Sequence, residues 1–155
     1  MTIRTLGRLL SEHPLFQGLS QETLDLLAGC ARNEVHKPGA FIYRTGEDAD
    51  RFYIVRHGAV ALENASVERG VLTIQTLGRG EVLGISWLVP PFRHHNDARA
   101  IGWARLVAID ARCLRDKCDQ DHDLGYALMR RFLPLFAERL KQAELQLMDV
   151  YNVHR

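Results

Sequence analysis

The sequence predicts a mixed α+β protein in which an antiparallel β-roll (a jelly-roll-like barrel) follows short N-terminal helices and precedes a long C-terminal helix. Three observations carry this prediction. Apolar residues recur at helical spacing in residues 1–31, short β-branched and aromatic runs alternate with glycine-marked turns in residues 32–110, and helical spacing returns in residues 111–155. A chain of 155 residues is expected to form a single domain, residues 1–155, with its own core.

The first part of the chain is expected to contain two short helices. Leucines recur there at helical spacing, and Pro14 and Gly18 interrupt the pattern. Ser20 is placed to cap the second helix. In the second part, the strand-like runs are AFIY, RFYIVRHGAVAL, VLTIQTL and WARLVAID. Short strands at regular spacing with turns between them predict the antiparallel roll.

The last part carries the most regular pattern. Asp110 is suited to cap a first helix, a longer helix is expected from Leu124 to about Tyr151, and Pro134 is expected to start a new helix or to kink this one. Apolar residues step alternately by three and four, as in a helix that packs along a partner helix. The stripe predicts a homodimer through this helix, and the alternative is that it covers the domain's own barrel. Its members are Leu133, Phe136, Leu140, Ala143, Leu147 and Val150.

Composition limits the partners and the compartment. The net charge is +1 with histidine neutral, so no strong field draws the chain to nucleic acid or to an anionic membrane. No apolar run approaches the roughly 20 residues of a membrane span, and the N-terminus lacks the apolar core of a signal peptide. Cys30, Cys113 and Cys118 are an odd number at no disulfide-framework spacing. We therefore expect a cytoplasmic protein.

An ordered set of turn residues resembles a known family. After HPLF and a short helix come Pro38-Gly39, Gly46, a FYIVRHG strand that ends at Gly58, and Gly80 leading to Gly84. This order resembles the cyclic nucleotide-binding domain of the catabolite activator and FNR type. The resemblance implies a regulatory sensor with a dimer-forming C-terminal helix. The chain ends without the helix-turn-helix domain that activators of this family carry, so we expect a stand-alone module without direct nucleic-acid binding.

The resemblance also implies how a ligand is held. Family members bind the cyclic phosphate through backbone N–H groups and an arginine, and the ribose through a glutamate that follows a glycine. Here the matching glycine is Gly84, but the glutamate position is Ile85 and the arginine position falls on His94 or His95. Pro90 and Pro91 (residues 90–91) interrupt the stretch where the family has a short helix.

The candidate ligand site is therefore altered in its polar groups. One hypothesis is that it binds another small anion, or a cyclic nucleotide more weakly, because a protonated histidine can replace part of the arginine's charge. The alternative is that Ile85, Trp87 and Phe92 fill the pocket and that the fold is a ligand-free module that binds another protein. The candidate ligand-binding residues are Gly84, Ile85, Ser86, Trp87, Arg93, His94, His95 and Arg99.

No catalytic machinery is visible, so the sequence predicts that the protein is not an enzyme and names no catalytic residue. There is no Ser-His-Asp elbow, phosphate loop or paired-carboxylate pattern. A cupin-like metal enzyme is a third interpretation, but adjacent histidines on a strand point to opposite faces. The Cys113, Cys118 and His122 spacing lacks the fourth ligand of a structural zinc site. No metal site is predicted.

Overall fold

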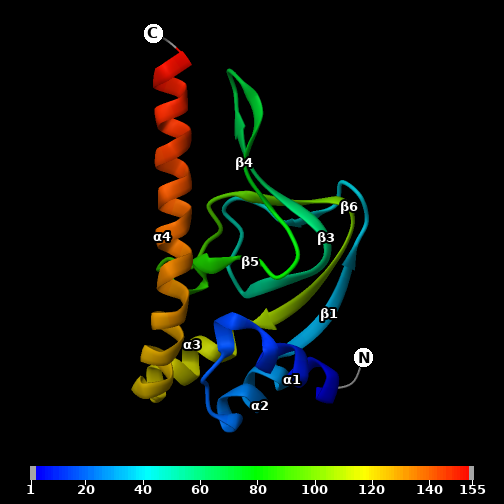
Figure 1. Ribbon diagram of the computed structural model, residues 1–155, viewed down its shortest axis with the longest axis vertical. Helices are drawn as coiled ribbons and strands as arrows, with labels where there is room; N and C mark the ends of the chain where they lie inside the picture. The colour runs from blue at the N-terminus through cyan, green and yellow to red at the C-terminus, as the bar shows by residue number, and fades with distance from the viewer. Residues whose placement is uncertain (1–2, 154–155) are drawn as a thin grey trace.

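The computed structural model describes residues 3–153, with side chains described for residues 6–151. Its element order confirms the predicted sequence of helices, roll and helices (Figure 1). The elements are α1 (Ile3–Glu12), the 3-10 helix η1 (Pro14–Phe16), α2 (Gln21–Gly29), β1 (Ala31–His36), β2 (Phe41–Tyr43), β3 (Arg51–Ser66), β4 (Gly70–Leu77), β5 (Val82–Leu83), the 3-10 helix η2 (Ile85–Leu88), β6 (Asp97–Asp110), α3 (Ala111–Gln120) and α4 (His122–Val153).

Two long strands organise the β-roll. β3 and β6 pair antiparallel from Arg51↔Asp110 to Glu63↔Asp97, and the six strands follow the order β1-β6-β3-β4, with β2 added on β6 and β5 on β3. Register shifts along β3 mark bulges, which bend a strand and let the ribbon curl over itself. At Gly58 the φ angle is 82° and a Cβ would lie 2.4 Å from the Trp103 carbonyl oxygen, so this approach of the two strands requires glycine.

Alternation along β3 separates two cores. Phe52 and Ile54 belong to a helix-side core between the roll and the helices, whereas Tyr53 and Val55 belong to a roll core inside the β-roll. In Figure 1, α1, α2 and α3 lie at one end of the roll and α4 stands along its side. The roll core comprises Tyr43, Tyr53, Val55, Val60, Leu62, Leu77, Leu83, Ala98, Leu106 and Ala108.

Side-chain caps set the helix boundaries. The Ser20 hydroxyl accepts from the Thr23 N–H at the start of α2, and Asp110 accepts from the N–H of Arg112 at the start of α3, as the sequence predicted. The expectation that Pro134 starts a new helix is wrong, since α4 runs through it. Buried Phe132 precedes the proline and partly buried Leu135 follows it, and both pack on the helix-side core. This packing holds the helix on both sides of the lost backbone hydrogen bond.

Candidate ligand-binding site

The segment that the resemblance marked as the ligand site, called the cassette here (residues 84–96), begins with an obligatory glycine. Gly84 has φ 83° and ψ 30°, in the left-handed region. A Cβ there would lie 2.9 Å from the Arg51 carbonyl oxygen and 3.2 Å from the Phe52 Cα. The single turn η2 follows, and the Pro90–Pro91 peptide bond comes next. The cassette therefore keeps its turn and one helical turn ahead of the prolines.

The helix-facing side of the cassette is tightly packed. Ile85 and Trp87 are buried in the helix-side core rather than inside the roll. The Trp87 ring stacks on Phe52 at 5.2 Å and meets Phe132 of α4 edge-on at 5.3 Å. Phe92 lies under the Arg115 guanidinium, 4.4 Å from its ring centroid. These positions correct the alternative in which Ile85, Trp87 and Phe92 fill the ligand pocket.

On the roll-facing side, His94 and not His95 lies beside Gly84. Its ring is 5% exposed and stacks on Tyr43, with centroids 3.6 Å apart and planes 7° apart, whereas His95 is exposed. Burial lowers the pKa of His94 to about 4, although the carboxylates of Glu47 and Asp50 oppose the shift. His94 is therefore neutral at pH 7. The structure thus argues against a protonated His94 in place of the family's arginine.

Both predicted arginines are held by carboxylates of this chain. Arg93 lies 3.4 Å from Asp48 and also donates to the Gly46 carbonyl at 2.8 Å. Arg99 pairs with the buried carboxylate of Glu63 at 2.8 Å. Ser86 is half-buried, and its carbonyl accepts from the Val89 N–H at the end of η2. Of the predicted site residues, the structure brings only Gly84 and His94 together on the roll side.

The hollow next to His94 is small and mixed in charge. Its volume of about 220 Å³ is below the roughly 300–1,000 Å³ of typical small-molecule pockets. Three carboxylates and two guanidinium groups face it, so its walls do not form a positive cradle for a phosphate. The lining residues are Ile42, Tyr43, Glu47, Asp48, Asp50, Arg51, Tyr53, His94 and Arg112.

Sequence reasoning missed Arg139, which reaches the roll from α4. Its guanidinium is half-buried and donates to the Val82 carbonyl of β5. Burial lowers the pKa of Arg139, while Tyr43 and Glu81 oppose the shift. A signal for it existed: Phe132, Phe136 and Arg139 follow helical spacing on one face, and the first two pack on the core.

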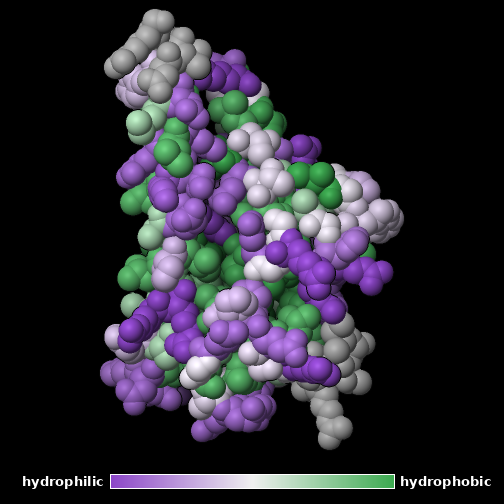
Figure 2. Space-filling model, viewed as in Figure 1, coloured by the Kyte–Doolittle hydropathy of each residue, from purple (hydrophilic) through white to green (hydrophobic). Residues whose placement is uncertain are grey.

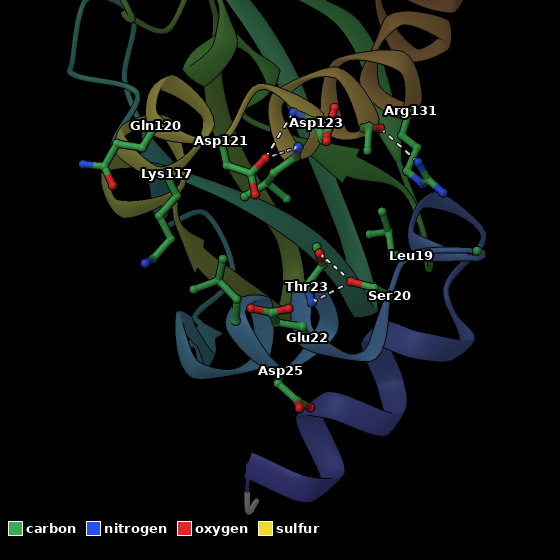
Figure 3. A pocket seen from close by; sticks show the side chains of 14 residues that line it. Leu19, Ser20, Glu22, Thr23, Asp25, Lys117, Gln120, Asp121, Asp123 and Arg131 are labelled. Carbon is green, nitrogen blue, oxygen red and sulfur yellow. Dashed lines mark hydrogen bonds between the residues drawn. The ribbon is translucent and has the colours of Figure 1, made fainter.

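Another groove lies between the helices, away from the cassette (Figure 3). It has a volume of about 770 Å³ between α2 and the start of α4. Its polar side chains serve the helix ends: Ser20 caps α2, Asp121 accepts from the N–H groups at the start of α4, and Arg131 donates to the carbonyls of Gln17 and Ala127. These groups complete backbone hydrogen bonding rather than converge on a ligand.

Two further expectations concern metals and membranes. Among the side chains of residues 6–151, no three His, Cys, Asp or Glu residues come together in a metal-ligand arrangement. No helix in the same range is long and apolar enough to cross a membrane.

Together, the roll, the glycine-initiated cassette and the long helix packed against it form the arrangement that the resemblance implied. The chain belongs to the cyclic nucleotide-binding domain family, whose profile matches residues 33–121. This finding confirms the resemblance drawn from the turn residues.

The names of individual proteins that are similar to this chain also refer to cyclic nucleotides. The chain is 29% identical over 142 residues to the cyclic AMP receptor protein of Thermus thermophilus, and 26% identical over 139 residues to cyclic nucleotide-gated channel beta-3 of Homo sapiens. These matches cover 86% and 88% of this chain but only 60% and 17% of the relatives. The crystal structure of a candidate cyclic nucleotide-binding protein from Geobacter metallireducens GS-15 superposes with a TM-score of 0.77 at 24% identity, over 90% of this chain and 98% of the other. That likeness shows the shared fold.

Proposed function

We propose that this chain is a sensing module in which a small anionic ligand, a cyclic nucleotide or another anion, binds in the β-roll and acts on the C-terminal helix. The observation that carries the proposal is the packing of Trp87. It is fully buried and joins the cassette to β3 through Phe52 and to α4 through Phe132. Close-packed interiors transmit displacements, so a ligand that repositions the cassette also repositions α4.

We propose that the outward face of α4 is the surface through which ligand binding affects a partner. Figure 2 shows hydrophobic side chains along this helix, and the predicted stripe is extended towards its start by exposed Tyr126 and Met129, at the same spacing. Leu88 and Val89 of the cassette border the same apolar surface, in a groove of about 630 Å³. We propose that a second copy of the chain covers this face. The groove residues are Leu88, Val89, Tyr126, Met129, Arg130, Leu133 and Phe136.

A ligand-free module that binds another protein is the second candidate. It is favoured by the commitment of Arg93 to Asp48 and of Arg99 to Glu63, together with a neutral His94. In that case the groove beside α4 would receive a partner protein without a small-molecule signal.

A thermal-shift screen separates the two candidates. The purified chain is heated with cyclic AMP, cyclic GMP, cyclic dinucleotides, linear nucleotides, pyrophosphate or sulfate. A ligand at about a hundred times its dissociation constant adds about 2.7 kcal/mol of stability, which is readily measured. The sensor proposal expects a saturable shift with at least one of these anions. A flat response across the panel contradicts it and favours the ligand-free module.

A further inference from the structure

Arg139 carries a charge that no described side chain of the protein pairs with. Within the part of the chain whose side chains are described, no carboxylate lies within ion-pairing distance of this guanidinium, and Glu81 acts on it only at longer range. The Val82 carbonyl is its hydrogen-bond acceptor. A guanidinium has five N–H donors, and a half-buried cation without a counter-ion is poorly satisfied. The site therefore has donors and positive charge in excess.

The neighbours of Arg139 place it at the start of the cassette. It bonds to Val82, two residues before Gly84. Tyr43 lies near enough to interact with the Arg139 charge, and its hydroxyl is hydrogen-bonded to the Gly84 backbone. The other neighbour of Tyr43 is His94, whose ring stacks on the Tyr43 ring. The helix α4, the strands β2 and β5 and the cassette thus meet around a single cation.

The cassette itself offers no comparable cation. Within the cassette, Arg93 is paired with a carboxylate and His94 is neutral at pH 7, and the neighbouring Arg99 of β6 is also paired with a carboxylate. Arg51 and Arg112 face the hollow beside His94 but lie 3.9 Å from Glu34 and from Asp110, whereas Arg139 has no carboxylate within ion-pairing distance among the described side chains. Bidentate guanidinium pairing with a phosphate is among the stronger hydrogen-bonded contacts in proteins.

We propose that Arg139, from the C-terminal helix, receives the phosphate of a small phosphorylated ligand in place of a cassette arginine, and that it leaves the Val82 carbonyl to do so. This inference rests on the proposed sensing function. It gives that function a direct switch, because the same guanidinium ties α4 to β5 when no ligand is bound. Gln146 lies further along α4 and donates to the Ile74 carbonyl of β4. This hydrogen bond attaches the C-terminal part of the helix to the roll. The exchange at Arg139 would change the helix position near the cassette while Gln146 keeps its contact.

The test is isothermal titration calorimetry, which measures the dissociation constants of cyclic AMP, cyclic GMP and pyrophosphate. It compares wild type with Arg139→Gln, Arg139→Lys and Lys141→Gln. Lys141 is an exposed cation two residues away on the same helix, so its replacement is the matched control for lost charge. We expect Lys141→Gln to bind like wild type and Arg139→Gln to bind about 10- to 100-fold more weakly, as for loss of a charged hydrogen bond. Arg139→Lys keeps the charge but not the planar fork, and we expect an intermediate loss.

The outcomes separate this inference from the proposed function. If wild type responds to a probe and Arg139→Gln binds it with wild-type affinity, the Arg139 inference is wrong while the sensing function stands. If wild type binds none of the three probes, both are wrong for phosphorylated ligands. If Arg139→Gln does not fold, Arg139→Lys decides, and unchanged affinity in that variant overturns the inference. A purely structural role would lower the melting temperature of the Arg139 variants without changing their dissociation constants.

Discussion

The two sides of the cassette differ in what they retain. On the helix-facing side, Ile85 and Trp87 are buried in a close-packed aromatic cluster that reaches α4. On the roll-facing side, the position that the resemblance assigns to the phosphate-binding arginine is a neutral His94, and the position that it assigns to the ribose-binding glutamate, Ile85, faces the helices instead. The cassette is therefore joined to the helix by apolar packing, while its polar positions differ from those that the resemblance implies. Under the proposed function, transmission to α4 and recognition of the ligand would be carried by different atoms of one short segment, so each could vary without the other.

The largest expected effect tests the helix-facing side. Trp87→Ala removes a fully buried indole that contacts both Phe52 and Phe132. We expect a loss of about 3–5 kcal/mol of unfolding free energy, the usual range for a buried tryptophan. Urea denaturation followed by circular dichroism measures it. The control is Trp103→Ala, at a tryptophan that is 58% exposed, and we expect a loss below about 1 kcal/mol. Equal losses would mean that the cassette is not anchored through Trp87.

The next prediction concerns Gly84, the first residue of the cassette. Gly84→Ala adds a Cβ 2.9 Å from the Arg51 carbonyl oxygen at a positive φ angle, and we expect about 3 kcal/mol of destabilisation. Gly80→Ala is the matched control, since Gly80 has φ 85° but open space around its missing Cβ. That change should cost only about 1–2 kcal/mol. The difference between the two variants isolates the close approach of the cassette to β3.

A third prediction extends the comparison to the outer face of α4. Leu133 is 67% exposed in the single chain and lies in the groove beside the cassette. If a second copy covers this face, Leu133→Glu buries a charge at the interface and should weaken dimerisation by about 2 kcal/mol, or roughly 30-fold. Analytical ultracentrifugation measures the dissociation constant. Val35→Glu places the same charge on an exposed aliphatic residue of β1, a strand that lies across the roll from α4 in Figure 1, and should leave the dimer unchanged. A monomeric wild type would refute the proposed homodimer.

The sequence predicted the fold because its signals are local. Turn glycines, the Ser20 and Asp110 caps and the alternation of core residues each act within a few positions, and the structure reproduces them. The expectation that Pro134 starts a new helix was wrong because packing on both of its sides outweighs the helix-breaking tendency of one proline.

The site could be predicted only in part. Counting residues from Gly84 located the altered polar positions but did not decide whether His94 or His95 takes the arginine position. Burial against Tyr43 identifies His94. Arg139 lies 55 positions after Gly84 in the numbering, on a helix whose stripe suggested a different role. Its approach to β5 depends on the tertiary fold, which a single sequence does not specify.

The smallest effect tests the roll-facing side through pH. Because burial holds the pKa of His94 near 4, the unfolded chain takes up a proton below its ordinary value of about 6.5 while the folded chain does not. Stability that is present at neutral pH is therefore lost as pH falls from about 6.5 towards 4. We expect His94 to contribute about 1–2 kcal/mol to the loss between pH 7 and pH 5. His94→Phe keeps an aromatic ring against Tyr43 without a titrating group, so its stability should fall less over that interval. His95→Phe changes an exposed ring and should follow the wild-type profile. If His94→Phe loses as much stability as wild type, the imidazole is not desolvated and a charged His94 returns as a partner for the anion.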